Sequence, residues 1–279
     1  MFSIGEEEST SSVAALLWSP PGPAKHKRSV LGVLTTNLVL SIWGSTNDPK
    51  EPGSWKRVMV INNLIEKYFE QLEEHQEIEA SRRRELIRLR KRMRAFSWSQ
   101  ACHLEGEIGR YDKWGASILA VTNDNNEIIF VHILRPNGHI STATKQWHAE
   151  VLGHLKASGV SEIPSFLAPS SLLALALNEQ RFVSHSSWSP WTASHDGGAS
   201  AILAYLAGDK LRFRRVRLKV SRTAAAKSSI GSDTFILDID EQDLDLNDEW
   251  IAEPGFIGPL HWYGEVCAYS LIHLVFSAA

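Results

Sequence analysis

One apolar stretch, repeated later in the chain, constrains the fold more than any other feature. Residues 16–43 (LLWSPPGPAKHKRSVLGVLTTNLVLSIW) read as three short strands separated by two turns. The first strand ends in Trp-Ser-Pro, and the prolines and glycine at positions 20–23 then force a turn. The apolar run Val30–Leu34 predicts a strand covered on both faces, and the alternation over Leu38–Trp43 predicts a third strand.

A similar pattern returns three times, and each copy opens on a tryptophan. Trp18, Trp98, Trp188 and Trp262 are 80, 90 and 74 residues apart, and apolar strand patterns follow each of them. A first strand ending in Trp-Ser-Pro and a third ending in Trp are typical of a WD40 propeller blade. An ordinary blade repeats every ~40–45 residues. Each interval therefore holds one blade with a long insertion, which we favour, or one visible and one degenerate blade.

The predicted fold class is all-β: a partial WD40-type β-propeller of about three blades plus an incomplete fourth. The acidic, serine-rich residues 1–12 are predicted to be a disordered N-terminus, and residues 13–279 an incomplete propeller domain. The predicted blades span 13–61, 95–155 and 181–239, with a fourth starting near 256. Five tryptophans are expected to pack inside the blades as structural anchors, namely Trp18, Trp43, Trp98, Trp188 and Trp262.

Residues 62–94 break the strand pattern and predict an inserted, charged helical segment. Leu64, Tyr68 and Leu72 stand at i, i+4 and i+8, the stripe of an amphipathic helix, and Asn62 or Asn63 is placed to cap it. Glutamates then lead and arginines follow, an order that complements the helix dipole. The segment is therefore predicted to form one or two helices between the first two blades.

Composition excludes several classes of protein. The formal net charge of the 279 residues is −3, so no global basic field points to nucleic acid. Two cysteines without a Cys-x-x-Cys pair exclude a disulfide scaffold and a cysteine zinc site. The sequence has no N-terminal apolar signal, and no apolar run reaches the ~18–20 residues of a membrane span. The expected compartment is the cytosol or the nucleus.

The sequence contains no motif for catalysis, for a cofactor or for a metal ion. The glycine-rich turns of acetyl-CoA-binding and nucleotide-binding folds are absent, as is a nucleophile elbow. His148 and His154 are six residues apart, which does not place them on one helical face. The aspartates of residues 238–245 lack the glycine and glutamate of a calcium loop. We therefore predict no catalytic residue, no cofactor and no metal site.

Three basic segments are candidates for contacts with a partner or with phosphate. The first is the loop Lys25–Arg28, at a blade rim where binding residues usually lie. The second is the helical insertion, for which a solvated face balanced by glutamates is the competing explanation. The third is the strand 211–220, where a parity change at Arg214–Arg215 predicts a β-bulge and one basic face. The candidate residues are Lys25, His26, Arg28, Arg82, Arg83, Arg84, Arg88, Lys91, Arg92, Arg212, Arg215, Arg217 and Lys219.

Four motifs resemble the N-terminal domain of the transcription factor IIIC delta subunits. They are L-x-W-S-P-P-G-x-A-K-H-x-R at 16–28, V-L-x-V-L-T-x-N-L-V-L-S-I-W at 30–43, W-K-R-V at 55–58 and R-x-R-A-F-S-W-S at 92–99. The Lys-His-x-Arg loop is the most specific part, since a bare Trp-Ser-Pro is common to many propellers. The resemblance is strongest over residues 13–100, and the rest of the chain follows by pattern only.

The resemblance implies a nuclear subunit of the general factor for RNA polymerase III genes, such as tRNA genes. It implies a non-catalytic scaffold that assembles other factor IIIC subunits, factor IIIB and RNA polymerase III for transcription initiation. Contact with DNA would be indirect or auxiliary, and no membrane would be involved. Two alternatives stay open: the histone acetyltransferase activity assigned to the family, which no motif supports here, and a generic WD-repeat adaptor for protein–protein interactions.

Overall fold

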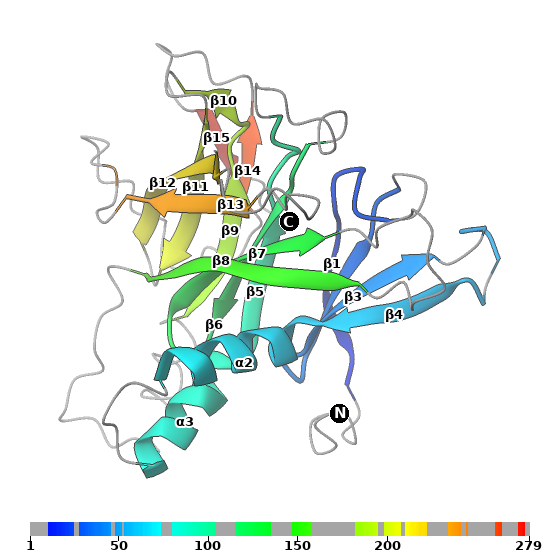
Figure 1. Cartoon of the computed structure of the whole chain (residues 1–279), viewed down its shortest axis with the longest axis vertical. Helices are drawn as coiled ribbons and strands as arrows, with labels where there is room; N and C mark the ends of the chain where they lie inside the picture. The colour runs from blue at the N-terminus through cyan, green and yellow to red at the C-terminus, as the bar shows by residue number, and fades with distance from the viewer. Residues whose placement is uncertain are drawn as a thin grey trace, which may run out of the picture.

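In the computed structural model, the described part of the chain folds into four antiparallel sheets and two helices (Figure 1). Strands make up most of this part, which confirms a mainly β fold. The N-terminal residues 1–10, predicted to be disordered, lie outside it. The described residues are 11–24, 28–45, 48–51, 53–73, 80–103, 115–134, 147–157, 182–194, 198–207, 210–221, 234–240, 244, 260–263 and 273–276.

Each sheet consists of consecutive strands, so neighbours in sequence are neighbours in space. Sheet one has the order β1-β2-β3-β4, sheet two β5-β6-β7-β8, sheet three β10-β11-β12-β13 with β9 also on β11, and sheet four β14-β15. The strands are β1 (Val13–Trp18), β2 (Leu31–Thr35), β3 (Leu40–Ser45), β4 (Trp55–Val60), β5 (Met93–Trp98), β6 (Ile118–Asn123), β7 (Glu127–Leu134), β8 (His148–Lys156), β9 (Val183–Trp188), β10 (Thr192–Ala193), β11 (Ala199–Ala207), β12 (Lys210–Ser221), β13 (Thr234–Ile239), β14 (Leu260–Tyr263) and β15 (His273–Phe276). The helices α2 (Ile61–Glu73) and α3 (Ala80–Arg90) lie between β4 and β5 in the chain. The sequence predicts the insertion at 62–94, and α2 begins one residue earlier.

The serine of each Trp-Ser pair fastens the first strand of its sheet to the second. In sheet one, the Ser19 amide donates to the Val30 carbonyl oxygen (2.9 Å), and the Val30 amide donates to Ser19 Oγ (2.9 Å). Backbone groups at strand ends need such partners when they are buried. The same two hydrogen bonds join Ser99 to Ile118 and Ser189 to Ile202, each at 2.8 Å. We call this repeated arrangement the serine bracket.

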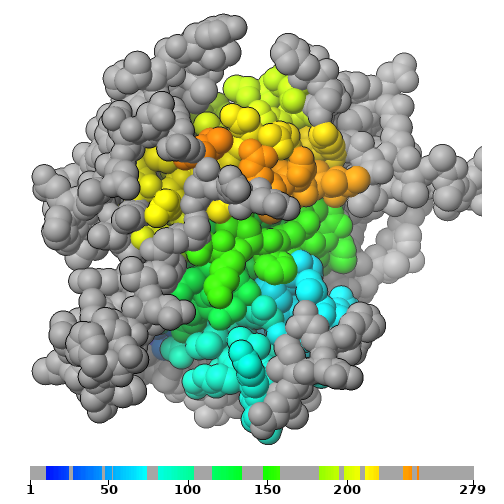
Figure 2. Space-filling model, turned by 90° about the vertical axis from the view of Figure 1, so that its left-hand side faces the viewer, coloured from blue at the N-terminus to red at the C-terminus, as the bar shows by residue number. Residues whose placement is uncertain are grey.

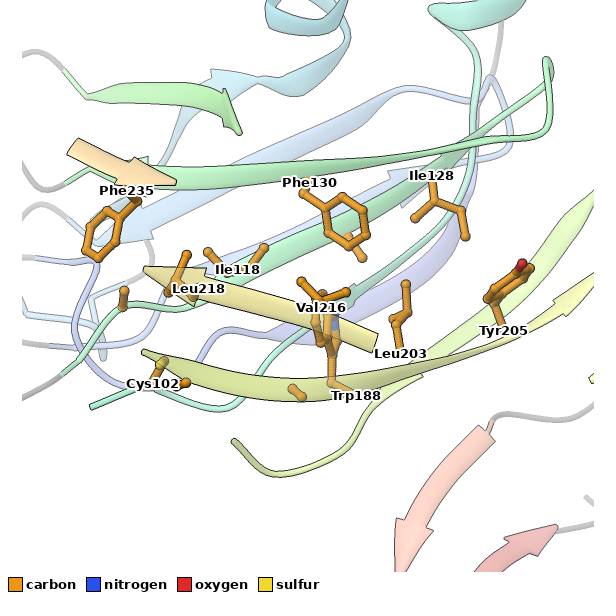
Figure 3. Close-up of a cluster of buried hydrophobic side chains, with 14 of the residues drawn as sticks. Cys102, Ile118, Ile128, Phe130, Trp188, Leu203, Tyr205, Val216, Leu218 and Phe235 are labelled. Atoms are coloured by element: carbon orange, nitrogen blue, oxygen red, sulfur yellow. The ribbon is translucent and has the colours of Figure 1, made fainter. Parts of the chain in front are cut away.

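The core forms where successive sheets pack face to face. One apolar cluster lies between sheet one, α2 and sheet two, and a second lies between sheets two and three. In the second cluster, Phe130 of β7 meets Trp188 of β9 with ring centroids 5.7 Å apart, and Leu203, Val216 and Leu218 also contribute to it (Figure 3). Because sheet two is covered on both faces, its central strands β6 and β7 are nearly continuous apolar runs.

The sheets are arranged in chain order about their first strands. Strand β1 contacts β5, β5 contacts β9, and β9 contacts β14. Figure 1 shows the result as a fan, with sheet one (blue) on one side, sheet two (green) in the middle and sheets three and four (yellow to red) beyond it. Radial repetition of four-stranded sheets is the architecture of a β-propeller, and the observed sheets are consistent with it.

The β-bulge predicted at Arg214–Arg215 is wrong. Strand β12 pairs with β11 from Lys210 to Leu218, which includes Arg214 and Arg215, without a register shift. Its apolar residues change parity because different neighbours cover its two faces. Leu211 and Phe213 pack in a small third cluster, whereas Val216 and Leu218 face the cluster shared with sheet two. A strand covered on both faces therefore imitates the pattern of a bulged strand.

The tryptophans predicted as anchors differ in their surroundings. Trp188 is 5% exposed, and Trp98 packs against the cluster between sheets one and two. Trp43 is half-buried, and Trp262 lies in β14. Trp18, in contrast, is 57% exposed, so the prediction that it packs inside the blade is wrong for the described structure.

Candidate functional site

One apolar stripe holds helix α2 against the sheets. Ile61, Ile65 and Phe69 are fully buried in the cluster between sheets one and two, and the helix contacts β3 and β8. Of the predicted stripe, Tyr68 packs at the side of this cluster and Leu72 is exposed. The helix lies where the sequence predicts it, but its buried stripe is one residue further along. Neither helix of the described residues is long and apolar enough to cross a membrane.

Asn62 is not the helix cap predicted from the sequence. It lies inside α2 and is buried. Its Oδ1 accepts a hydrogen bond from the Leu40 amide (2.8 Å), and its Nδ2 donates to the carbonyl oxygens of Leu38 (2.9 Å) and Lys91 (2.7 Å). Leu38 has a φ of 62°, a left-handed conformation that is uncommon for leucine. The Asn62 side chain therefore ties a tight turn before β3 and the end of α3 to helix α2.

A buried ion network joins both helices to sheet two. Arg90, the last residue of α3, donates from Nε to both carboxylate oxygens of Glu127 (2.9 and 3.1 Å) and from Nη1 to Glu73. Its guanidinium also lies over the Phe69 ring, 4.2 Å from the centroid. Glu73 is 2% exposed and Glu127 is 4% exposed. Two buried carboxylates thus depend on one cation, and loss of that cation would leave both of their charges uncompensated.

The turn between β6 and β7 fixes the position of Glu127. Asn123 Oδ1 accepts hydrogen bonds from the amides of Asn125 (3.0 Å) and Glu127 (2.9 Å). Asn123 Nδ2 and Asn125 Nδ2 donate to the Glu127 carboxylate at 3.0 and 2.9 Å. Asn126 adopts the left-handed conformation, with a φ of 58°, which asparagine tolerates. The sequence predicts a hairpin turn here, but no sequence pattern links it to Arg90.

A second polar contact holds α2 to β8. The Tyr68 hydroxyl lies 2.9 Å from His154 Nδ1, and the two rings meet edge to face. Burial lowers the pKa of His154, and burial together with the Glu127 carboxylate raises the pKa of the Tyr68 hydroxyl. Both shifts favour a phenol that donates to a neutral imidazole. Among the described residues no group of three or more His, Cys, Asp or Glu side chains could hold a metal ion.

Several basic residues of the insertion, predicted as partner contacts, are used inside the molecule. Their acceptors are acidic side chains and one carbonyl group at the end of α2. These contacts hold the helical insertion in place, and the nitrogen atoms that make them could bind another molecule only after rearrangement. Arg83 donates to the Glu73 carbonyl oxygen (3.0 Å), Lys91 pairs with Glu66 (3.4 Å) and Arg92 pairs with Asp124 (3.2 Å).

Arg82, Arg84 and Arg88 lie at the surface of α3, and we call them the arginine tip. Arg88 pairs there with Glu85 at 2.9 Å. In Figure 1, α3 stands away from the sheets beyond α2. Guanidinium groups bind carboxylates and phosphates through paired hydrogen bonds, so a surface of this kind suits an acidic partner. The arginine tip carries three of the six candidate basic residues of the helical insertion. The other end of α3 is held in place by Arg90, which pairs with Glu73 and Glu127.

The basic residues of β12 do not form the single face predicted from the sequence. A regular strand alternates its side chains, so the basic residues divide between two faces. Arg214 is buried and donates to the Asp240 carbonyl oxygen (2.8 Å). On the other face, Arg217 pairs with the carboxylates of Asp238 (3.3 Å) and Asp240 (2.6 Å). By the register of β12, Arg212 shares the face of Arg214, and Arg215 and Lys219 share the face of Arg217.

The two predicted basic segments that the structure describes, α3 and β12, are not brought together as one surface. Lys25 and His26 lie outside the described residues, and Arg28 is exposed. In Figure 2, α3 (cyan) and the strands β12 and β13 (yellow and orange) lie at opposite ends of one face, with green strands of sheet two between them. The helical insertion is therefore the candidate site that the structure defines best.

The repeated antiparallel sheets agree with a comparison against protein-family models. Residues 1–276 match the model of the transcription factor IIIC subunit delta β-propeller domain. A search of curated proteins gives no match. Since the family model covers nearly the whole chain, the chain belongs to the family of transcription factor IIIC delta-subunit β-propeller domains.

Proposed function

We propose that this chain is a non-catalytic scaffold in the nucleus, as part of the general RNA polymerase III transcription factor IIIC. It would hold other factor IIIC subunits, factor IIIB and the polymerase together at tRNA-type genes, with only auxiliary contact to DNA. Membership of the delta-subunit family supports this proposal. The absence of catalytic and cofactor motifs from the sequence agrees with a binding role.

The observation that carries the proposal is the fixed helical insertion. Arg90, Glu73, Glu127 and Asn62 attach α2 and α3 to sheets one and two by buried polar contacts. A binding element held in this way loses little conformational entropy when a partner docks. The arginine tip lies on the element that is fixed, so we expect acidic segments of partner proteins to bind there.

The test compares two charge-reversed variants of the tagged chain in nuclear extract. One is Arg82→Glu with Arg84→Glu, on the arginine tip; the other is Lys50→Glu with Lys56→Glu, which changes the same charge at exposed positions of sheet one. Mass spectrometry then identifies the proteins that co-purify. We expect the unmodified chain and the sheet-one variant to recover factor IIIC subunits equally, and the tip variant to recover several-fold less.

Two results would count against the proposal. If the unmodified chain is soluble and monodisperse but recovers no factor IIIC subunit, the scaffold role is wrong for this chain. If the tip variant recovers the subunits as well as the unmodified chain does, the scaffold role stands and the tip is not its contact surface.

A further inference from the structure

Two arginines meet one buried carboxylate where sheet two begins. The Arg92 Nε atom lies 3.2 Å from Asp124 Oδ2, and Arg94 Nε donates to Asp124 Oδ1. The Asp124 side chain is 3% exposed, whereas those of Arg92 and Arg94 are 39% and 30% exposed. The Arg94 guanidinium also lies over the Phe182 ring, 4.2 Å from its centroid. Two partly exposed guanidinium groups are therefore held beside each other, and we call Arg92 and Arg94 the arginine pair.

A β-bulge and a hairpin turn bring these side chains together. The register between β5 and β6 shifts between Met93 and Ala95, which makes Arg94 the extra residue of the bulge. The Asp124 amide donates to the Arg92 carbonyl oxygen (3.1 Å), so the turn after β6 lies against the start of β5. The local backbone therefore directs both arginines to Asp124.

Sheet one has the same backbone arrangement at its own first turn, but with uncharged side chains. The register between β1 and β2 shifts at Ala14, and the Thr36 amide donates to the Ser12 carbonyl oxygen (2.9 Å). Leu38, with a φ of 62°, has the left-handed conformation that Asn126 has in sheet two, where φ is 58°. By these contacts Ser12, Ala14 and Thr36 of sheet one correspond to Arg92, Arg94 and Asp124 of sheet two.

The turn itself therefore does not require the charged side chains. In sheet one, the Ser12 amide donates to Thr36 Oγ1 (3.1 Å), so a hydroxyl group stands where sheet two buries a carboxylate. Burial of a carboxylate costs free energy, and ion pairs with partly exposed arginines offset little of that cost. Stability does not account for the three charges of sheet two, whereas binding of an anion does.

The chemistry of the arginine pair fits a phosphate group. A guanidinium group has five N–H donors, and the contacts with Asp124 use the Nε–H of each arginine. The Nη donors of two neighbouring guanidinium groups match the three oxygens of a phosphomonoester, which carries a charge of about −1.5 to −2 at pH 7. A carboxylate offers two oxygens and a single charge, so it fits two guanidinium groups less well.

We propose that the arginine pair binds the phosphate of a phosphoserine or phosphothreonine in a partner protein, with Phe182 and Asp124 holding Arg94 in place. The neighbouring cations Arg88, Arg90 and Lys91 each pair with a glutamate. The pair therefore suits one isolated anionic group and not the regular series of phosphates along a nucleic acid, and the chain as a whole has a net charge of −3. This inference stands on the comparison of the two sheets and does not rest on the proposed scaffold role or on the arginine tip.

A binding experiment on the purified chain tests the proposal. The probe is N-acetyl-phosphoserine amide, titrated with the chain and followed by ³¹P NMR. The competitors are N-acetyl-aspartate amide and a thymidine oligonucleotide, which represent a carboxylate and a nucleic acid. We expect saturable binding of the probe, and each competitor should displace it several-fold less effectively than unlabelled phosphoserine amide does. Absence of saturable binding, or stronger binding of the oligonucleotide, would overturn the proposal.

A variant that gives sheet two the side chains of sheet one separates binding from folding. Arg92→Ser, Arg94→Ala and Asp124→Thr are combined, which removes the cations together with the carboxylate and leaves no buried charge unpaired. We expect this triple variant to fold and to lose saturable binding, whereas Lys67→Gln, at an exposed position of α2, should bind the probe as the unmodified chain does. Equal binding by the triple variant and the unmodified chain would overturn the proposal.

Arg94→Lys provides a second test that holds even if the triple variant does not fold. Lysine keeps a cation beside Asp124 but has no forked set of donors, so we expect the probe to bind several-fold more weakly. A melting curve establishes that the variant is folded. Unchanged binding of the probe by Arg94→Lys would mean that the guanidinium does not contact the phosphate and would overturn the proposal.

Discussion

At the scale of single residues, the serine bracket explains why serine follows the tryptophan at the end of three first strands. The side-chain oxygen of Ser99 accepts from the Ile118 amide at 2.8 Å, and the Ser99 amide donates to the Ile118 carbonyl oxygen at 2.8 Å. A hydroxyl group reaches this amide only from the residue that directly follows the strand. The Trp-Ser pattern indicates the repeats in the sequence, but the pattern by itself does not predict this hydrogen bond.

Replacement of this serine should therefore destabilise the fold. Ser99→Ala leaves the buried Ile118 amide without its acceptor, and we expect the free energy of unfolding to fall by about 1–3 kcal/mol. Urea denaturation followed by fluorescence measures the change. Ser11→Ala, at an exposed position, should cause no loss, and equal stabilities for the two variants would contradict the role of the bracket.

The lowered pKa of His154 predicts how the stability of the folded chain depends on pH. Burial lowers the pKa of His154 in the folded chain, so the unfolded chain binds a proton more readily. The contribution of the neutral imidazole is complete above the unfolded pKa of about 6.5 and is lost as the pH falls below it. We expect the melting temperature to decrease between about pH 7 and pH 5, and to decrease less in His154→Gln. His103→Gln, at an exposed position, should retain the full pH dependence.

At the scale of elements, the helical insertion depends on contacts that are remote in sequence. Glu73 ends α2, Arg90 ends α3, and Glu127 opens β7 of sheet two. The stripe on α2 and the order of its charges predict the helices and their approximate bounds. They do not predict which arginine pairs with the buried Glu73 and Glu127, because Arg90 differs from its neighbours only in the fold around it. The sequence also does not predict how β12 packs, because a regular strand buried on both faces has the same apolar pattern as a strand with a bulge.

Arg90 should therefore matter far more than an arginine on the exposed tip. Arg90→Met leaves Glu73 and Glu127 buried without a cation, and we expect a loss of about 3–5 kcal/mol in unfolding free energy. The control Arg88→Met removes only an exposed pair with Glu85 and should leave stability unchanged. Adding Glu73→Gln and Glu127→Gln to Arg90→Met should recover part of the loss. If the triple variant is less stable than Arg90→Met alone, buried charge is not the cause.

At the scale of the whole molecule, the repeated tryptophans predict the number and order of the described sheets. The strands of sheets one to three lie close to their predicted positions, since Trp-Ser pairs and apolar runs are local signals. The exposure of Trp18 and the division of the β12 arginines depend on what covers each face. Which face of a strand is buried depends on how the sheets pack against one another, and no local sequence pattern predicts this.

The spacing between sheets one and two makes a prediction at this scale. A methyl group at Gly32 would lie 2.5 Å from the buried Phe96 ring, so in Gly32→Ala either this ring or the two sheets must shift. We expect a loss of about 1–3 kcal/mol in unfolding free energy, measured by urea denaturation. Gly53→Ala is the matched control, because nothing lies within 4 Å of its added methyl group. A Gly32→Ala variant as stable as the control would mean that the junction can adjust at no cost.

The buried ion network also sets an order of events while the chain is being made. Arg90 lies 17 residues after Glu73, and Glu127 lies a further 37 residues on. When only α2 has left the ribosome, the Glu73 carboxylate has no cation with which to enter the core, because Arg90 has not yet been made available. Helix α2 and Arg90 can therefore take their final places together with Glu127 only after the hairpin of β6 and β7 has left the ribosome, so sheet one completes its packing together with sheet two.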